Sequence, residues 1–157
     1  KIKIGNNVRI DDFCILSGRI TIGDNVHIAA YSALYGGEVG IKIDDFANIS
    51  SRVCIYAVSD DYSGYTLTNP TIPDKYKNVH KECVVISKHV IIGSGSTILP
   101  GVVLEEGTAI GAMSLCKEST KPWLIYAGIP AKVIKERKKD LLKLEENYKS
   151  SGGVLPN

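Results

Sequence analysis

Aliphatic residues recur along this chain with a period of six. They stand at Ile4, Ile10, Leu16, Ile22, Ile28 and Leu34, then at Ile43, Ile49 and Ile55, and again at Ile86, Ile92, Ile98, Leu104 and Ile110. An amphipathic helix places its apolar residues three and four apart, and a simple strand places them two apart. A period of six therefore predicts a short strand and a tight turn, repeated many times.

Small and polar residues follow the aliphatic residue in many of these units, as in IGNNVR, IGDNVH and IGSGST. Gly, Asp and Asn are typical of tight turns. A single unit buries too little apolar surface to be stable alone, so the units must stack. The units resemble the hexapeptide repeats of left-handed parallel β-helices, in which three units form one triangular coil. An all-β solenoid is therefore expected over residues 1–115.

Two interruptions break the period. YGGEVG lengthens the spacing between Leu34 and Ile43, and a long polar segment separates Ile55 from Ile86. If three units make one coil, both interruptions leave the third face and return on the first. We expect them to lie at one corner of neighbouring coils, with loop 56–84 protruding as part of a functional site. Tolerated loop growth is the alternative interpretation.

Residues 116–157 have a different character and are predicted to form a connector, an α-helix and a tail. Pro130 suits the first turn of a helix. The apolar residues that follow among charged ones, which would form one side of that helix, are Val133, Ile134, Leu141, Leu142 and Leu144. We expect this helix to pack beside the last coil and cover its exposed edge. The final SGGVLPN is typical of a flexible tail.

Charge and cysteine content narrow the class of protein. The net charge is only +2, which gives no indication of binding to nucleic acid or to an anionic membrane, and no apolar run is long enough to span a membrane. The cysteines form no CxxC pair and stand at Cys14, Cys54, Cys83 and Cys116. This spacing indicates neither a zinc site nor a disulfide framework, so a reduced, cytoplasmic protein is expected. Because Lys1 falls inside a repeat, we expect a few residues to precede it.

The segment IIGSGSTILPGVVLEEGTAIGAMSLCKE, followed by YAGIPAKVIKER, resembles the hexapeptide acyltransferases. The similarity is greatest to galactoside and maltose O-acetyltransferases, including those of surface-polysaccharide gene clusters. The resemblance implies transfer of an acetyl group from acetyl-CoA to a sugar hydroxyl without a metal. It also implies a homotrimer with active sites between subunits.

The same resemblance assigns the cofactor residues. It places acetyl-CoA along Gly93, Ser94, Ala112, Ser114, Lys117, Gly128, Pro130 and Lys132. Small residues would let the pantetheine lie against the backbone, and lysines would meet the phosphates.

The catalytic base departs from the family pattern. Galactoside-type enzymes carry a histidine early in the corner loop, but the matching stretch here, YAVSDDYSG, has none. VHIAAY, which contains His27, resembles VHISPG of nucleotide-aminosugar N-acetyltransferases, whose histidine lies in the active site. We predict that His27 is the base or a donor to the thioester carbonyl, oriented by Asp60 or Asp61 across the subunit boundary. A surface histidine without a role is the alternative; His80 is a second candidate, and His89 is expected to be solvated on a turn.

Aromatic and amide side chains near the loop are candidates for acceptor binding. They are Tyr31, Tyr35, Asn48, Tyr56, Tyr62 and Asn69, together with His80. Flat apolar faces and directional polar groups are typical of sugar sites. The alternative interpretation is that the tyrosines only pack the loop.

Three other functions remain open. An N-acetyltransferase of a nucleotide-linked amino sugar is favoured by the surroundings of His27, but disfavoured by the galactoside-like C-terminal segment and by the lack of an N-terminal nucleotide-binding domain. A γ-type carbonic anhydrase needs three zinc-binding histidines, and the histidine spacing here is wrong for it. A non-catalytic assembly platform is the last alternative.

Overall fold

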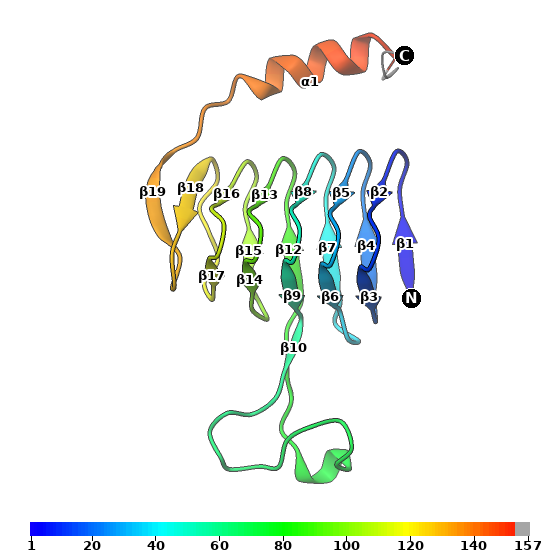
Figure 1. Cartoon of the computed structure of the whole chain (residues 1–157), viewed down its shortest axis with the longest axis vertical. Helices are drawn as coiled ribbons and strands as arrows, with labels where there is room; N and C mark the ends of the chain where they lie inside the picture. Colours follow the sequence, from blue (N-terminus) through cyan, green and yellow to red (C-terminus); the bar gives the residue numbers. More distant parts are fainter. Residues whose placement is uncertain (153–157) are drawn as a thin grey trace.

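The computed structural model describes residues 1–152; residues 153–157, which hold most of the predicted tail, lie outside the described part. The chain is a parallel β-solenoid with three sheets, a protruding loop and a C-terminal helix (Figure 1), so the predicted fold class is confirmed. The first sheet contains β1 (Ile2–Ile4), β4 (Ile20–Ile22), β7 (Ile41–Ile43), β12 (Val84–Ile86) and β15 (Val103–Leu104). The second contains β2 (Arg9–Ile10), β5 (His27–Ile28), β8 (Asn48–Ile49), β13 (Ile91–Ile92), β16 (Ala109–Ile110), β18 (Leu124–Ala127) and β19 (Lys132–Glu136). The third contains β3 (Ile15–Ser17), β6 (Ala33–Tyr35), β9 (Cys54–Tyr56), β14 (Thr97–Ile98) and β17 (Leu115–Cys116).

The register of the sheets follows the six-residue period. In the second sheet Ile10 pairs with Ile28, Ile28 with Ile49, and Ile49 with Ile92. These aliphatic side chains point inward, and most of them are fully buried in one continuous core. Burying an aliphatic side chain contributes about 1.5–3 kcal/mol, so each unit is held in register by its own core residue.

The corners are made by residues with left-handed backbone conformation. At the corner between the second and third sheets they are Phe13, Tyr31, Arg52, Gly95 and Met113; between the first and second sheets they include Asn7, Asn25, Phe46, His89, Gly107 and Trp123. Such conformations are uncommon for bulky residues, but stacking between successive coils compensates, as in the Phe46–His89 pair at 5.3 Å between ring centroids. At Gly107 a Cβ atom would lie 2.4 Å from the Trp123 ring, so only glycine fits.

The two interruptions meet at the corner between the third and first sheets, as predicted. Glu38, in the short interruption, forms an ion pair with Lys81, in the long one, at 3.4 Å. The long interruption, residues 58–83, is called the arm below. It leaves the solenoid through an antiparallel pair, β10 (Val58–Ser59) and β11 (His80–Lys81), and contains one short 3-10 helix, η1 (Asp74–Tyr76) (Figure 1).

The C-terminal region differs from its prediction. The helix α1 is Leu141–Ser150 and does not begin near Pro130. Residues 132–136 instead form β19, which pairs antiparallel with β18 and covers the end of the second sheet. Val133 and Ile134 are β-branched, which favours a strand. Parallel pairing also continues to β18, beyond the predicted end at Leu115.

Helix α1 also lies in a different place from the one expected. It runs back over the corner between the first and second sheets, towards the N-terminal coils (Figure 1). The Tyr148 hydroxyl donates to Asn25 Oδ1 at 3.1 Å. The helix therefore ties several coils together along one corner, and β19 covers the last edge.

Candidate active site

Short side chains form a continuous column at the corner between the second and third sheets. This small-residue corner consists of Ala29, Ala30, Ser50, Ser51, Gly93, Ser94, Gly111, Ala112, Ala127 and Gly128. Backbone bonds join its coils, such as Ser50 N to Ile92 O at 3.0 Å and Gly93 N to Ile110 O at 2.7 Å. A Cβ atom on Gly93 would lie 2.4 Å from the Ala112 nitrogen. Gly93 is therefore required by the close packing of neighbouring coils, and the short Ala and Ser side chains of the corner would let a ligand approach its backbone closely.

The eight predicted cofactor residues fall into three groups. Gly93, Ser94, Ala112 and Gly128 lie in the small-residue corner itself. The Ser114 hydroxyl is occupied: it donates to Gly111 O at 2.7 Å and accepts from the Gly128 N–H at 3.1 Å, so Ser114 braces the turn. The others, Lys117, Pro130 and Lys132, line a small cavity of about 50 Å³ after β17.

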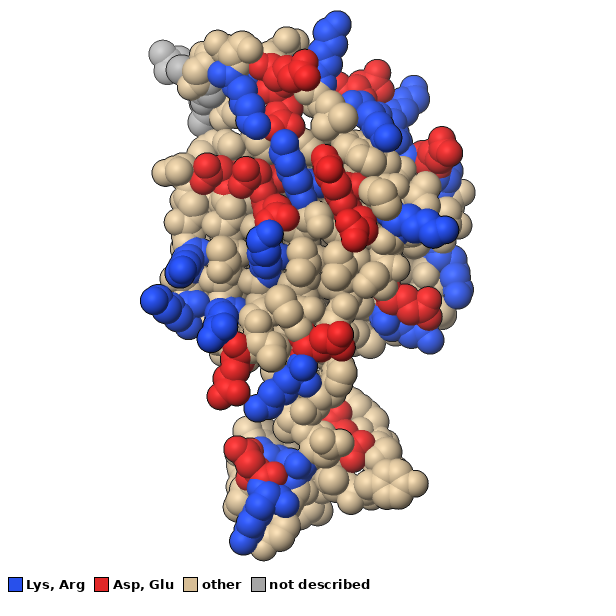
Figure 2. Space-filling view, turned by 180° about the vertical axis from the view of Figure 1, so that it is seen from behind, with Lys and Arg blue, Asp and Glu red and all other residues tan. Residues whose placement is uncertain are grey.

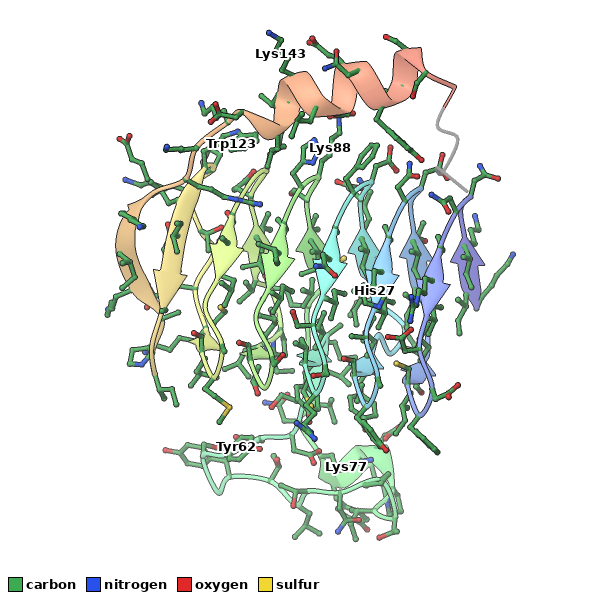
Figure 3. The ribbon with its side chains drawn as sticks, turned by 45° about the horizontal axis from the view of Figure 1, so that its top comes forward. His27, Tyr62, Lys77, Lys88, Trp123 and Lys143 are labelled. Atoms are coloured by element: carbon green, nitrogen blue, oxygen red, sulfur yellow. The ribbon has the colours of Figure 1, made fainter. Side chains whose placement is uncertain are left out.

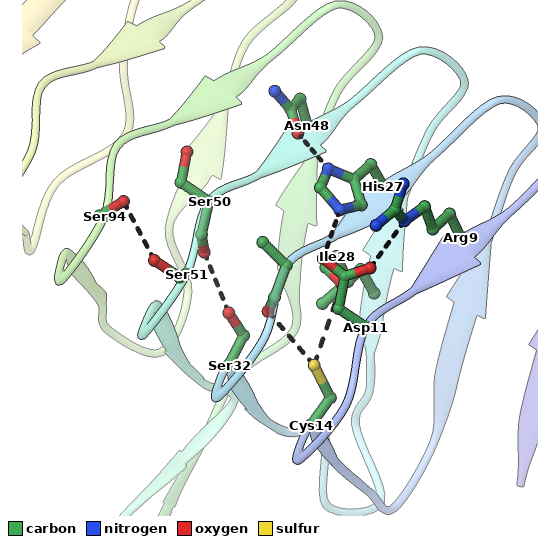
Figure 4. A network of polar contacts seen from close by, with 11 residues as sticks. Arg9, Asp11, Cys14, His27, Ile28, Ser32, Asn48, Ser50, Ser51 and Ser94 are labelled. Atoms are coloured by element: carbon green, nitrogen blue, oxygen red, sulfur yellow. Dashed lines mark hydrogen bonds and ion pairs between the residues drawn. The ribbon is translucent and has the colours of Figure 1, made fainter.

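His27 lies in β5 between the buried Val26 and Ile28, so its side chain points outward from the second sheet. Its Nε2 is 3.0 Å from Asp11 Oδ2, and its Nδ1 is 3.1 Å from Asn48 Oδ1 (Figure 4). Arg9 Nε donates to the other Asp11 oxygen at 2.7 Å. Hydrogen bonds from His27 and Arg9 lower the pKa of the Asp11 carboxyl. Both ring nitrogens of His27 therefore face oxygen atoms, and the residue is held by partners on the coils on either side.

The two predicted carboxylates lie in the arm and do not contact His27 within this chain. Asp61 accepts from the Ser63 N–H at 2.8 Å and from the Thr66 hydroxyl at 2.9 Å. Hydrogen bonds from Ser63 and Thr66 lower its pKa. Asp60 lines a cavity of about 370 Å³, called the arm cavity, with Tyr56, Val58, Ser59, Tyr62, Thr97, Leu99 and Pro100. In this chain Asp11 therefore takes the orienting position beside His27, and contact of Asp60 or Asp61 with His27 across a subunit boundary stays a prediction.

The predicted acceptor residues are divided between two regions. At the root of the arm, Tyr35 and Tyr56 stack at 5.2 Å, and Tyr62 is 93% exposed beside the arm cavity (Figure 3). Tyr31 stacks instead on Phe13 at the small-residue corner, at 5.0 Å. The remaining residues lie apart from one another. Asn48 contacts His27, and Asn69 accepts a hydrogen bond from the Thr71 N–H in a turn. His80 Nε2 is 3.4 Å from Glu82 Oε2.

His89 is buried, which contradicts the expectation that it is solvated. Its side chain is 7% exposed, and its Nε2 is 2.7 Å from Glu145 Oε2 in α1. Lys88 and Lys149 contact the other Glu145 oxygen, at 2.7 and 2.5 Å. Burial alone would raise the pKa of Glu145, but hydrogen bonds from Lys149, Lys88 and His89 outweigh it and lower the pKa to about 2. This charged cluster fixes α1 to the corner of the solenoid.

A groove of about 400 Å³ lies between α1 and the second sheet. Among its lining residues are Phe46, Asn48, Ile91, Arg137, Leu144 and Tyr148. Asn48 belongs both to this groove and to the His27 cluster. We call it the α1 groove. No sequence pattern indicates it, because it exists only where α1 runs back over the solenoid.

The remaining surface is mixed in charge. Figure 2 shows basic and acidic side chains interspersed over the back of the solenoid. Within residues 1–152 no three His, Cys, Asp or Glu side chains are grouped to hold a metal ion, and the three histidines have separate surroundings. No helix in the described part is long and apolar enough to cross a membrane. The four cysteines are unpaired, and burial raises the pKa of the Cys116 thiol to about 11.

The repeat, the small-residue corner and the outward histidine define a hexapeptide-repeat acyltransferase. Residues 1–36 match the bacterial transferase hexapeptide (six repeats) family. A dTDP-4-amino-4,6-dideoxy-D-glucose acyltransferase from Escherichia coli is 53% identical over 153 residues, which are 96% of this chain and 79% of that protein. The chain belongs to this family of bacterial hexapeptide-repeat acyltransferases and is an acyltransferase.

Two further relatives bear on the acceptor. The structure of AntD, an N-acyltransferase from Bacillus cereus in complex with dTDP and 3-hydroxybutyryl-CoA, is 59% identical and has a TM-score of 0.95; the match covers 98% of this chain and 81% of AntD. Galactoside O-acetyltransferase from Escherichia coli K12 is 28% identical over 74% of this chain and 63% of that protein. The similarity to sugar O-acetyltransferases is therefore present, but it is weaker than the similarity to N-acyltransferases.

Proposed function

We propose that this chain transfers an acyl group from acyl-CoA to the amino group of a dTDP-linked amino-dideoxy sugar. The observation that carries the proposal is the identity of more than half over nearly the whole chain to two acyltransferases, one named for dTDP-4-amino-4,6-dideoxy-D-glucose and one bound to dTDP and an acyl-CoA. O-acetylation of a sugar, the first interpretation of the sequence, rests on a relative of only 28% identity. The alternative, N-acylation of a nucleotide-linked amino sugar, is therefore preferred.

The small-residue corner suits the acyl donor. Its exposed backbone would let the pantetheine of acyl-CoA lie against Gly93 and Ala112, and Lys117 and Lys132 beyond its end would meet the phosphates. In the reaction the amine nitrogen attacks the thioester carbon, a C–N bond forms and the C–S bond breaks. The nitrogen loses a proton, and the CoA sulfur takes one. The chain thus has to bind both substrates side by side and accept or relay that proton.

His27 is the residue that we propose as base. Its contact with Asp11 is the arrangement in which a carboxylate fixes the tautomer and orientation of an imidazole. Asp11 would accept a hydrogen bond from the Nε2–H, which leaves Nδ1, facing Asn48, as the nitrogen that takes the proton from the amine. An unprotonated Nδ1 accepts a hydrogen bond, so the Asn48 amide would have to present its NH₂ group to Nδ1 in this state.

The spacing of two side chains supports a role for the start of the arm. AntD variants changed at a serine, or at an aspartate ten positions after it, have been crystallised with dTDP or the dTDP-amino sugar and CoA. In this chain a serine precedes an aspartate by ten positions only at Ser50–Asp60 and Ser51–Asp61. Both serines lie in the small-residue corner, and both aspartates were predicted from the sequence. We propose that Asp60 or Asp61 attracts the ammonium form of the acceptor amine.

The proposed active unit is a homotrimer with sites between subunits. The arm leaves the corner between the third and first sheets, whereas the small-residue corner joins the second and third. An arm from one subunit would therefore complete the site at its neighbour's small-residue corner. Unpaired cysteines and an acyl-CoA substrate are in keeping with the predicted cytoplasmic location.

The proposed function is tested by offering two acceptors to the purified chain with acetyl-CoA. We expect free thiol to be released, and an amide product to form, with dTDP-4-amino-4,6-dideoxyglucose and not with a galactoside. Acetylation of the galactoside alone would overturn the proposal. His27→Ala should lower kcat about 10²–10⁴-fold without changing acetyl-CoA affinity, and Asp11→Asn should shift the pH profile of kcat. Equal loss of acetyl-CoA binding in His27→Ala would instead indicate a structural role.

A further inference from the structure

The α1 groove has the size and the chemistry of a small-molecule site. Its volume of about 400 Å³ is within the range of ligand pockets. Phe46 and Tyr148 lie edge to face, 6.1 Å apart, and Phe46 also stacks on His89 at 5.3 Å, so an aromatic cluster lines the groove where a nucleobase can pack. Asn48 adds an amide with both a donor and an acceptor at the end nearest His27. These are the groups that a nucleoside needs.

One arginine, Arg137, lines the groove. Arg137 Nη1 donates to the carbonyl oxygens of His89 and Gly107, at 2.7 and 3.0 Å, which holds the guanidinium in place. Lys88 lies beneath α1 (Figure 3) and, with Lys149, compensates the charge of Glu145. Glu145 lines the groove as well, so Arg137 is the group of the lining that would meet an anionic group such as a diphosphate.

The arm cavity has similar volume and the opposite charge. Its charged lining residue is Asp60, and no lysine or arginine contributes to it. A diphosphate would be repelled there, whereas an ammonium group would be attracted. Of these two cavities, only the α1 groove is lined by an arginine that a diphosphate could contact.

One strand connects the groove to the proposed reaction centre. Phe46 and Asn48 line the groove, and Ser50 lies in the small-residue corner at the other end of β8. Four residues of extended chain span about 13 Å, which is comparable to the length of an extended sugar diphosphate. A ligand lying across the second sheet would therefore pass His27 between the two ends.

We infer that the α1 groove binds the nucleoside diphosphate end of the acceptor, an inference that rests on the proposed function. The nucleobase packs against Phe46 and Tyr148, and the diphosphate lies near Arg137. The sugar then extends over His27 towards the small-residue corner. Helix α1, which no sequence pattern connected to the site, becomes one wall of the acceptor site.

The test uses a charge placed at the mouth of the groove. Leu144 lines the groove and is 66% exposed, so Leu144→Glu and its neutral control Leu144→Gln should both fold. The whole chain is titrated with dTDP at low salt by calorimetry, and Trp123, the single tryptophan, gives a second signal from beside His89. We expect Leu144→Glu to weaken dTDP binding about tenfold or more relative to Leu144→Gln, because like charges are brought together.

Matched controls separate the possible outcomes. Tyr62→Glu puts the same charge at the arm cavity and tests whether the nucleotide binds there instead. Leu67→Glu, at an exposed arm position outside both cavities, should leave dTDP affinity unchanged, and acetyl-CoA affinity should be the same in all variants. If wild type binds dTDP and Leu144→Glu equals Leu144→Gln, the groove inference is wrong and the proposed function stands. Weakening by Tyr62→Glu alone would move the nucleotide to the arm cavity. If wild type binds acetyl-CoA but not dTDP, the proposed acceptor class is itself wrong.

Discussion

The solenoid and the arm are two ways of ordering a chain. In the solenoid, inward side chains such as Ile55 are fully buried, and most coils pair with a neighbour on each side. In the arm, residues 58–83, no apolar side chain is buried, although the Lys77 side chain is only 9% exposed, and Tyr62 and Tyr65 are more than 90% exposed. The arm is held by a two-residue ribbon and by local bonds such as Thr66 to Asp61. Stability therefore resides in the repeated coils.

This difference assigns separate tasks to the two regions. Stacked coils support one another, so the small-residue corner and His27 are held in a fixed register. A segment with few buried contacts opens at low free-energy cost, which is common in binding loops. We therefore expect the arm to become ordered against a neighbouring subunit or the acceptor, and the solenoid to be the same with or without them.

The largest expected effect contrasts one core residue with one arm residue. Ile55→Ala should lower the free energy of unfolding by about 2–5 kcal/mol, because it removes buried methyl groups and leaves a cavity. Tyr62→Ala should change it by less than about 0.5 kcal/mol, since the ring is exposed. Urea denaturation of both variants measures the contrast. A Tyr62→Ala variant as unstable as Ile55→Ala would mean that the arm contributes to the core.

The solenoid was predictable from the sequence because every unit repeats the same physical requirement. An aliphatic residue each six positions must point inward, so the faces, the stacking of Ile28 on Ile49 and the common corner of both interruptions followed. The position of the C-terminal helix was not predictable from the sequence. Pro130, followed by a few apolar residues among charged ones, fits the start of a helix as well as a strand. Residues 132–136 pair with β18, and no local signal specifies that pairing.

The candidate site was predictable in part for the same reason. The period placed His27 outward beside Asn48, which the structure has 3.1 Å apart. Asp11 was missed because it belongs to a turn, where Asp is common without any function. The contact of His89 with Glu145 joins residues far apart in sequence, and it depends on α1 returning over the solenoid. The α1 groove was missed because it also depends on α1 returning over the solenoid.

A middle-sized effect is expected where α1 meets the solenoid. Glu145→Gln keeps the shape of the side chain but removes a buried charge that contacts two lysines and His89, so it should destabilise the protein by about 1–3 kcal/mol at pH 7. The folded-state pKa of Glu145 is about 2, below its ordinary value of 4.5. Its stabilising effect is therefore complete above pH 4.5 and is lost as the pH falls from 4.5 towards 2.

The control for this variant is the next residue of the same helix. Glu146 is exposed, so Glu146→Gln should change neither stability nor its pH dependence. Thermal unfolding of both variants and wild type is measured at pH 7 and at pH 3. We expect Glu145→Gln to lose less stability than wild type between these values. An equal loss in both would show that the charge of Glu145 does not hold α1.

The smallest expected effect lies at the boundary between the two regions. Tyr35 and Tyr56 stack at 5.2 Å on successive strands of the third sheet, where the arm begins. A double-mutant cycle with Tyr35→Leu and Tyr56→Leu should give a coupling of about 0.5–1.5 kcal/mol, as for other aromatic pairs. The same cycle measured on the KM for the acceptor tests the boundary itself. If the stack belongs to the solenoid, coupling will appear in stability and not in KM; coupling in KM alone would instead make these rings part of the arm and of the acceptor site.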